Sequence, residues 1–477
     1  KTGGGAGTID FDGATINTKI RGLSFMADGT GSKINFSGNT TGNIDNYGTV
    51  FYLKPVKTAS SITDTANFNT TASILPAFTA MINNYFSNLG NLTLNMNDKS
   101  NMVVTSYISG NVSDLTFDDT TAFGGAGRPT INGDYKAFLL DKSNVTVDVD
   151  SDLDTTSTGT AAAYRRIALS NSTITNNKKI SGTQSGLVAM AQQDETTDGW
   201  VTLTNSSGAS IELAGDKSVA IYGSNGKIVN AGDIKVGDRG VAIFGDNAGY
   251  GDSDISNTGT ITIGSEATGI YAKNYTTKDV KNNGTITING DKSSGMAFAP
   301  GNLTKTTTVV FENVATIEDK NSGSNNTGMF AKKATSGAYD TINSGTITLG
   351  DSSSLGNPSV GMYTNTSVTG TNPLKNIGTI KVGKNGIGLY GYEETTTGNV
   401  TVGDSGIALY SQGGDVNIGS STTNPTIKVG DTNATAVYTT GSGQTVTSTK
   451  ASYDIGTGSY GFVNVNSGTG NTINISG

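Results

Sequence analysis

The chain has 477 residues and a formal net charge of −8, with 66 Gly, 7 Pro, 1 Trp, 0 Cys and 0 His. An acidic chain without clustered Lys and Arg is a poor partner for nucleic-acid phosphates, so we expect no nucleic-acid ligand. No apolar run reaches the roughly 20 residues that a membrane-spanning helix needs.

Low charge with abundant Gly, Asn, Ser and Thr is also typical of disordered chains. Here, however, Val, Ile, Leu, Phe and Tyr recur in every window of about ten residues and offer apolar surface for burial. We therefore expect a folded chain. The absence of Cys suits a protein that is exported unfolded through a narrow pore.

Residues 1–200 alternate apolar and polar positions as strands do, but they carry only degenerate copies of the motifs found later. Within them, the range 71–89 has apolar residues at spacings of three and four, which predicts one amphipathic helix. This helix would be a lid over the surrounding β-structure or, alternatively, part of a binding surface. The apolar residues are Ile74, Leu75, Phe78, Met81, Ile82, Tyr85 and Phe86.

Two further irregularities in residues 1–200 carry acidic side chains. On a strand, Asp148, Asp150, Asp152 and Asp154 would point to one face, where carboxylate oxygens suit Ca²⁺ or a cationic ligand group. The alternative is a solvated outer face, neutralised by Arg165 and Arg166 one coil later. The second irregularity contains Asp194, Glu195, Asp198 and Trp200, the chain's single Trp.

From about residue 200 the chain repeats itself with a period of about 20 to 33 residues, which indicates a repeat architecture. One motif reads Asn-x-Gly-Thr-Ile-x-(Val/Ile/Leu)-(Gly/Asn), and a second reads Gly-(Ile/Met/Val)-(Ala/Gly)-x-(Tyr/Phe) or its shorter form Gly-(Ile/Met)-(Tyr/Phe). The first occurs at 257–264, 282–289, 343–350 and 376–383, and the second at 240–244, 269–271, 295–298, 328–330, 361–363, 386–390 and 406–410.

The second motif places an aromatic residue once in each repeat. We expect these residues to form an interior or flank stack, and a ligand-binding aromatic stripe is the alternative. They are Tyr222, Phe244, Tyr271, Phe298, Phe330, Tyr363, Tyr390, Tyr410 and Tyr438.

Each motif alternates with period two, as in Thr260-Ile261-Thr262-Ile263, where the two Ile share one face. A coil of such short strands has too little core alone, so coils must stack and pair their backbones. We therefore predict an all-β, right-handed parallel β-helix with a short helical insertion, irregular over 1–200 and regular over 201–477. Asn and Gly would occupy its corners because both tolerate left-handed backbone conformations.

Catalytic signals are weak. Gly403-Asp404-Ser405-Gly406 matches the surroundings of a serine nucleophile, but the chain lacks the histidine base that such a serine needs. The G-x-G-x-x-G match at 456–461 is followed by a strand pattern, and the calcium-repeat-like stretch at 249–254 is a single copy. We read the first two as coil corners. The remaining enzymatic alternative is polysaccharide cleavage by two carboxylates, drawn from Asp118, Asp119, Asp134, Asp194, Glu195 and Asp198.

The repeats resemble the passenger domains of the large monomeric (type Va) autotransporter adhesins of fusobacteria, which include galactose-inhibitable and arginine-inhibitable members. The resemblance rests on the Asn-x-Gly-Thr-Ile motif alternating with Gly-Ile-Gly-Leu-Tyr-Gly at 386–391 and Gly-Ile-Ala-Leu-Tyr-Ser at 406–411, and it is best over 200–477. It implies a secreted virulence factor at the outer membrane, anchored by a C-terminal β-barrel that this fragment lacks. It also implies attachment to other bacteria, as in coaggregation, or to host cells.

We therefore expect a non-enzymatic, monomeric adhesin segment that binds a glycan or protein on a host or bacterial surface. A passive stalk and a polysaccharide-cleaving β-helix are the alternatives. No cofactor, catalytic residue or metal site is predicted, although Ca²⁺ would suit the acidic row. The predicted ligand-binding residues are Asp148, Asp150, Asp152, Asp154, Asp194, Glu195, Asp198 and Trp200.

Overall fold

In the computed structural model the chain forms two compact units, Lys1–Ala214 and Gly215–Gly477. The predicted division at residue 200 stays a prediction. The structure describes residues 7–20, 22–27, 31–45, 48–53, 57–58, 61–62, 72–73, 79, 82–97, 100–106, 109–114, 123–133, 136–141, 144–149, 153–154, 164–167, 172–183, 185–193 and 201–214 of the first unit. It describes the second unit except residues 225, 248–253, 276–278, 302–308, 321–322, 334–338, 366–373 and 466–469.

The first unit consists mainly of parallel ladders, meaning strands paired in a row. One ladder contains β3 (Leu23–Ala27), β6 (Thr49–Leu53), β12 (Asn101–Ser106), β15 (Lys136–Asp141), β18 (Tyr164–Ile167) and β21 (Val188–Gln193). Two short ladders contain β1 (Thr8–Phe11), β4 (Lys33–Phe36) and β10 (Phe86–Ser87), and β2 (Thr15–Thr18), β5 (Thr40–Ile44), β11 (Leu92–Asn95) and β14 (Thr130–Asn132). A further ladder contains β9 (Ala72–Ser73), β13 (Ser109–Asp114), β16 (Asn144–Val149), β19 (Ser172–Asn176) and β22 (Val201–Asn205). The last contains β17 (Leu153–Asp154), β20 (Lys179–Gly182) and β23 (Ser210–Leu213). A small hairpin joins β7 (Lys57–Thr58) to β8 (Ser61–Ile62).

The helix predicted over 71–89 is too long. Thr79 and residues 82–85 have helical backbone, but β9 and β10 are strands within the same range, and the 3-10 helix η1 (Leu89–Asn91) begins at its end. Asn88 precedes η1 with a left-handed backbone (φ 55°), and the remaining residues of this range lie outside the described ones. Strand pairing explains the early end, because Phe86 pairs with Ile34 of β4 and its ring packs 4.8 Å from that of Phe51. A second 3-10 helix, η2 (Gly124–Ala126), follows later.

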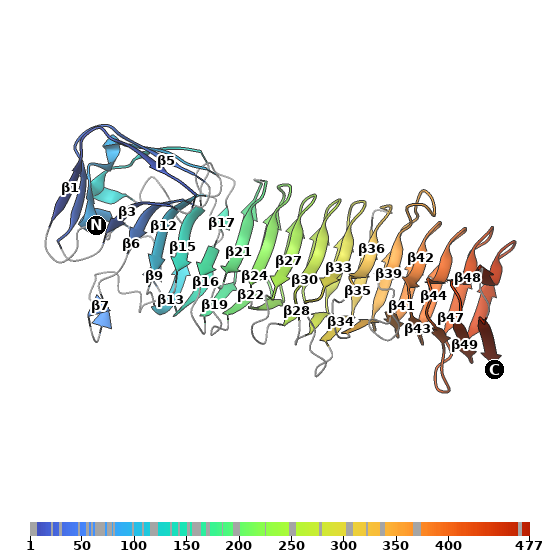
Figure 1. Ribbon diagram of the computed structural model, residues 1–477. Coiled ribbons are helices and arrows are strands. Elements are labelled where there is room, and N and C mark those ends of the chain that lie inside the picture. The colour runs from blue at the N-terminus through green and yellow to red at the C-terminus, as the bar shows by residue number, and fades with distance from the viewer. Residues whose placement is uncertain are drawn as a thin grey trace. The chain divides into compact units, whose positions relative to one another are not determined.

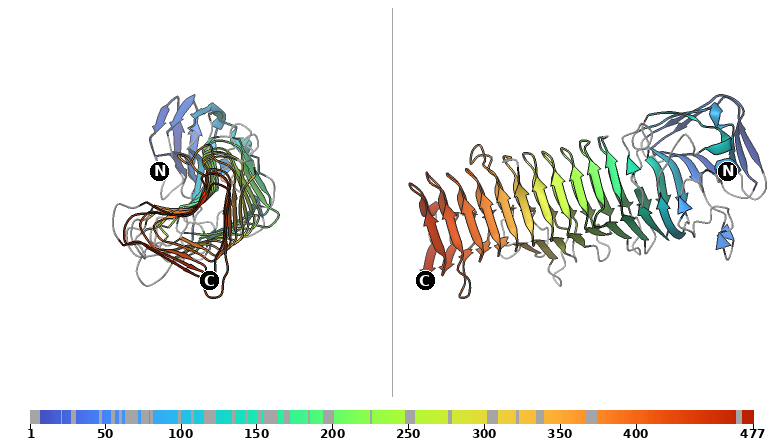
Figure 2. Two further views of the ribbon diagram at one scale, coloured as in Figure 1. Left: turned by 90° about the vertical axis from the view of Figure 1, so that its right-hand side faces the viewer. Right: turned by 180° about the vertical axis from the view of Figure 1, so that it is seen from behind.

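The second unit is built from three parallel ladders, which Figures 1 and 2 show as rows of arrows coloured from green to red. The first ladder contains β24 (Val219–Ser224), β27 (Val241–Asp246), β30 (Thr268–Lys273), β33 (Ser294–Ala299), β36 (Thr327–Ala331), β39 (Val360–Thr364), β42 (Ile387–Gly391), β45 (Ile407–Ser411), β48 (Thr435–Thr440) and β51 (Tyr460–Val465). The second contains β25 (Lys227–Asn230), β28 (Ile255–Asn257), β31 (Val280–Asn282), β34 (Val309–Asn313), β37 (Tyr339–Asn343), β40 (Leu374–Asn376), β43 (Glu394–Thr396), β46 (Val416–Ile418), β49 (Thr445–Thr449) and β52 (Thr472–Ser476). The third contains β26 (Asp233–Val236), β29 (Thr260–Ile263), β32 (Thr285–Ile288), β35 (Thr316–Asp319), β38 (Thr346–Leu349), β41 (Thr379–Val382), β44 (Asn399–Val402), β47 (Thr426–Val429) and β50 (Ser452–Ile455).

The chain passes through the first, second and third ladders in turn and then returns to the first, one coil further on. This order defines a parallel β-helix, so the predicted fold class is confirmed. We call the connections from the first to the second ladder the first corner, those from the second to the third the second corner, and those from the third back to the first the third corner.

Period-two alternation places the apolar side chains inside the coil. Ile261 and Ile263 are 0% exposed, whereas Thr260 and Thr262 face outward. Ile261 pairs with Ile286 of the next coil, so like residues stack along the interior. One coil alone has too little apolar core, and stacking like residues in register buries their side chains between neighbouring coils.

The asparagines of the first motif form a buried column at the second corner, here called the asparagine column. They are at most 1% exposed, and each side-chain amide donates to the Oδ1 of the next asparagine at 2.6–2.8 Å. Asn376 Nδ2 ends the column by donating to Thr396 Oγ1 at 3.0 Å. Because buried amides are costly unless bonded, the column fixes the alignment of successive coils. Its members are Asn230, Asn257, Asn282, Asn313, Asn343 and Asn376.

Left-handed Asn occurs at the third corner, as expected for corner residues, for example at Asn325 (φ 61°) and Asn385 (φ 54°), but none of the described Asn-x-Gly copies of the first motif has a positive φ. The repeated left-handed positions lie instead at the third corner, at residues such as Arg239 (φ 53°), Glu266 (φ 54°) and Lys292 (φ 56°). The motif needs Asn for its side-chain hydrogen bonds. It needs Gly because a Cβ on Gly284 would lie 2.1 Å from the carbonyl oxygen of Gly259 in the preceding coil.

Candidate ligand-binding face

A row of aromatic side chains lies on the outer face of the first ladder. The ladder pairs Phe330 with Tyr363, Tyr363 with Tyr390, Tyr390 with Tyr410 and Tyr410 with Tyr438. All five side chains are partly exposed, while the residue before each ring is buried. We call this row the aromatic column. The sequence left open whether these aromatic residues stack inside the coil or on its flank, and the aromatic column lies on the flank.

Stacking decides which parts of these rings reach solvent. Ring centroids are 5.3 Å apart for Phe330 and Tyr363, 5.1 Å for Tyr363 and Tyr390, and 4.7 Å for Tyr390 and Tyr410, with interplanar angles of 26°, 21° and 7°. Tyr438 meets Tyr410 edge-on at 86°. Because the stacked rings cover one another's faces, the column presents ring edges and phenol hydroxyls to a partner.

The same row begins in earlier coils with Tyr222, Phe244 and Tyr271 and is interrupted at Ala297. The sequence motif assigned Phe298 to the row, and this assignment is wrong by one residue. Phe298 pairs with Ala272 and is 0% exposed. Its ring stacks inside the coil on Phe311 at 5.2 Å. The reason is that Gly295-Met296-Ala297 aligns with the short form of the motif, so Ala297 takes the outer position and the following Phe298 points inward.

Polar groups flank the aromatic rings. Gln412 Nε2 donates to Tyr390 Oη at 2.5 Å, and burial raises the pKa of the Tyr390 phenol, which therefore stays neutral and able to donate a hydrogen bond. In an earlier coil, Lys273 Nζ lies 3.0 Å from Asp246 Oδ2, and this hydrogen bond raises the pKa of Lys273. The face is thus a mixture of aromatic edges, hydroxyls and paired charges.

The first corner borders this face and is variable in length. β42 ends at Gly391 and β43 begins at Glu394, whereas β27 ends at Asp246 and β28 begins at Ile255. The second corner is mostly short, as between Asn282 and Thr285, whereas the third corner also varies and has a long connection between Leu349 and Val360. In repeat proteins, insertions of variable length often border the binding side.

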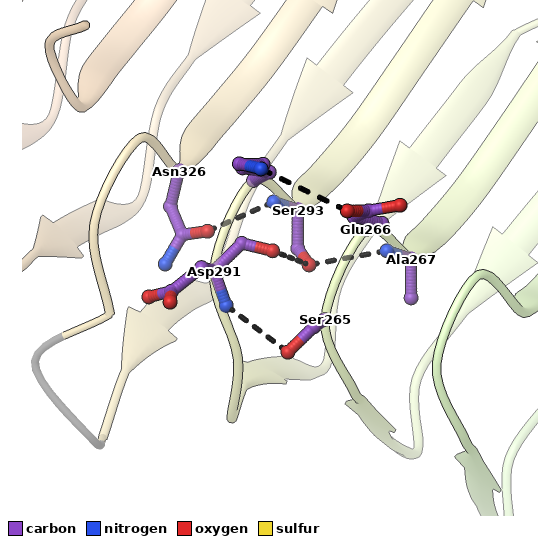
Figure 3. A network of polar contacts seen from close by, with 7 residues as sticks. Ser265, Glu266, Ala267, Asp291, Ser293 and Asn326 are labelled. Atoms are coloured by element: carbon purple, nitrogen blue, oxygen red, sulfur yellow. Dashed lines mark hydrogen bonds and ion pairs between the residues drawn. The ribbon is translucent and has the colours of Figure 1, made fainter.

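The third corner uses its polar side chains to join coils (Figure 3). Ser293 Oγ donates to the Gly264 carbonyl at 2.7 Å and accepts the N–H of Ala267 at 3.1 Å, while Asn326 Oδ1 accepts the N–H of Ser293 at 2.9 Å. Asp291 Oδ1 likewise accepts a backbone N–H from the next coil, at 2.7 Å. These oxygens are occupied by protein donors, which gives the corner a structural role.

The ligand-binding residues predicted from the sequence all fall where their side chains are not described. Asp148 lies in β16 and Asp154 in β17, but only their backbones are described. Asp150, Asp152, Asp194, Glu195, Asp198 and Trp200 lie outside the described residues, as do Asp118, Asp119 and Asp134. These assignments stay predictions. The sequence contained the signal for the aromatic column, in its once-per-repeat Tyr, but not for the partner Gln412, because no fixed motif position marks it.

The motifs read as corners are confirmed as corners. Ser405 has a left-handed backbone (φ 55°) at the third corner, and its Oγ donates to the carbonyl of Thr432 at 3.1 Å. Residues 456–459 form the equivalent corner before β51. Of the stretch 249–254, only Asp254 is described, and it lies 3.6 Å from Lys227 Nζ.

Within the described ranges, no three Asp, Glu, Cys or His side chains gather in a way that would hold a metal ion. The described helical segments also lack the length and apolar character that crossing a bilayer requires.

The family model of the BigA third pectate lyase-like domain matches residues 85–307. No curated protein and no solved structure is similar enough to count as a match. The family match supports a surface protein with a β-helical domain and is consistent with an adhesive or a stalk role.

Proposed function

We propose that the chain is a bacterial cell-surface adhesin segment of the monomeric autotransporter type. Its partner would be a glycan or protein on a host or bacterial surface. The observation that carries this proposal is the aromatic column, a continuous row of exposed ring edges and hydroxyls beside the variable first corner.

The chemistry of the column suits such a partner. Tyrosine combines large contact area with low conformational entropy and a hydroxyl that donates or accepts, which is why it is enriched at protein interfaces. Here neighbouring coils already hold the rings in place, so binding would cost little further side-chain ordering. Repetition along the ladder would let several weak contacts act together on a repetitive surface.

The test is binding of the purified chain to partner bacteria and to host cells, with galactose or free arginine as competitor. We expect saturable binding that is reduced at least tenfold by the triple change Tyr363→Ser, Tyr390→Ser and Tyr410→Ser. This loss corresponds to about 1.4 kcal/mol of binding free energy.

A matched control changes the outer face of the third ladder in three consecutive coils that overlap those of the tyrosines, with Thr348→Ala, Lys381→Ala and Thr401→Ala. These residues stack in register on the outside and should leave binding within twofold. If both triple variants fold and bind alike, the aromatic column is not the contact surface.

A passive stalk is the second candidate, and the uniform asparagine column favours it, because an unbroken internal column needs no ligand to explain it. A folded chain that binds no cell would establish this role. The acidic row at 148–154 and the stretch 192–200 stay a separate proposal for the contact surface, and changing their Asp and Glu residues to Asn and Gln in the same assay would test it.

A further inference from the structure

Among the described residues, the aromatic column holds consecutive tyrosines of neighbouring coils in contact. Tyr390 and Tyr410 are paired in register, their ring centroids are 4.7 Å apart, and their planes differ by 7°. Nearly parallel rings in register place corresponding carbon atoms opposite one another. Gln412, on the same coil as Tyr410, donates to the hydroxyl of Tyr390 and so ties its ring over Tyr410.

We propose that Tyr390 and Tyr410 form an oxidative cross-linking site, at which a peroxidase using hydrogen peroxide joins the two rings as dityrosine. Each phenol loses one electron and one proton to become a phenoxyl radical. The two radicals couple through a new carbon–carbon bond between their Cε positions, and each of these carbons then loses its hydrogen to the phenol oxygen as the rings regain aromaticity. Hydrogen peroxide takes up the two electrons and two protons and leaves as two water molecules.

Ring distances and interplanar angles predict which neighbouring pair of tyrosines is cross-linked first. Tyr363 and Tyr390 are also stacked, at 5.1 Å and 21°, so they form the second expected pair. Tyr410 and Tyr438 are equally close at 5.0 Å but stand at 86°, which does not set their Cε atoms opposite one another. The cross-link should therefore join Tyr390 to Tyr410 first and to Tyr363 second.

The cross-link would matter because the chain has 0 Cys and cannot form a disulfide. A bond between side chains on consecutive coils closes a short loop of chain and reduces the entropy of the unfolded state. It would bind one coil to the next covalently on the face exposed to solvent, where an oxidant arrives.

The experiment treats dilute purified protein with horseradish peroxidase and hydrogen peroxide. Dityrosine fluorescence, loss of two hydrogen masses, and a proteolytic fragment that joins the peptides of residues 390 and 410 are the expected results. The Tyr390→Phe variant keeps every ring of the column but removes both stacked tyrosine pairs, and we expect its intramolecular dityrosine in this column to fall at least fivefold.

An earlier part of the row supplies a gain-of-function variant. There Phe244 separates Tyr222 from Tyr271, and it stacks on Tyr271 at 5.0 Å and 30°. Phe244→Tyr should create a new cross-link between positions 244 and 271, with its added hydroxyl at the exposed edge.

Unchanged dityrosine in Tyr390→Phe would overturn the proposal. So would cross-links found only between molecules, or no dityrosine in the folded wild-type protein.

Discussion

At the scale of single residues, Glu394 is the one carboxyl-bearing side chain that is buried in the described part of the second unit. It is 0% exposed in β43, between Leu374 of the preceding coil and Val416 of the next. Its Oε1 accepts the N–H of Gly391 at 2.9 Å, while its Oε2 has no hydrogen-bond partner. Burial raises the pKa of this carboxyl well above its ordinary value of 4.5, so the folded protein keeps this proton to a higher pH than the unfolded chain does.

This burial makes stability depend on pH. Below the ordinary pKa both folded and unfolded chains are protonated, and the contribution of Glu394 to stability is fully present. As pH rises towards the folded pKa, the unfolded chain releases its proton first, and the free energy of unfolding falls by up to about 1.4 kcal/mol per pH unit.

We therefore predict that Glu394→Gln, a neutral side chain of the same shape, stabilises the protein increasingly above about pH 4.5. Denaturant titrations from pH 4 to pH 8 would measure the difference. Glu393→Gln, at the partly exposed preceding residue, is the matched control. A gain that is equal at both ends of this pH range would contradict the prediction.

The sequence predicts the burial of a residue correctly where its position in the repeat has the same surroundings in every coil. It fails where packing in one coil departs from the repeat. Ile261 and Ile263 were placed inside correctly from alternation alone. Phe298 was misplaced because two forms of one motif differ by a residue, and only the pairing with Ala272 fixes its face. Glu394 gave no signal at all, since nothing in the sequence indicates that a carboxyl occupies a position filled by Leu or Val in neighbouring coils.

At the scale of elements, the asparagine column couples the second ladder to the third. Asn282 accepts from Asn257 at 2.7 Å and donates to Asn313 at 2.8 Å. Removing one member leaves a buried acceptor on Asn313 without its donor. An unsatisfied buried group of this kind costs about 1–3 kcal/mol.

We predict that Asn282→Ala lowers the free energy of unfolding by about 1–3 kcal/mol or more, as measured by denaturant unfolding. Asn283→Ala changes the exposed residue immediately after it and should stay within about 0.5 kcal/mol of wild type. Equal effects of the two changes would mean that the column contributes no stability.

The strands themselves were predictable from sequence, whereas the chemistry of their corners was not. Tolerance of left-handed backbone explains Asn385 at the third corner, but it does not explain Asn-x-Gly at the second corner, where the structure has a buried amide next to a close backbone approach. The predicted helix over 71–89 had the right period in residues 82–85, and pairing of Phe86 with β4 then overrode it. Local pattern alone does not report which strand lies in the next coil.

At the scale of the whole molecule, each coil of the second unit contacts mainly the coils before and after it, as in other solenoids. Deleting residues 268–293 removes β30, β31 and β32, which form one complete coil. The deletion would bring Asn257 next to Asn313 and Ile261 next to Ile317, so like residues still meet.

We predict that this deletion variant keeps its β-structure and still unfolds cooperatively, as followed by circular dichroism. Deletion of residues 268–282 removes only β30 and β31 and would bring a third-ladder strand into the first ladder. This second variant should lose the fold of the adjoining coils. Similar unfolding of the two variants would contradict coil-by-coil independence.

The hydrogen bonds of the second unit's ladders join one coil to the next, and this direction has a mechanical consequence. A force that pulls successive coils apart acts along these bonds, and the outermost coil, held from one side, gives way before the others. The 25 residues from Asn257 to Asn282 would then extend to about 85 Å. Under load the unit would lengthen in steps and dissipate energy at each one while the remaining coils stay intact.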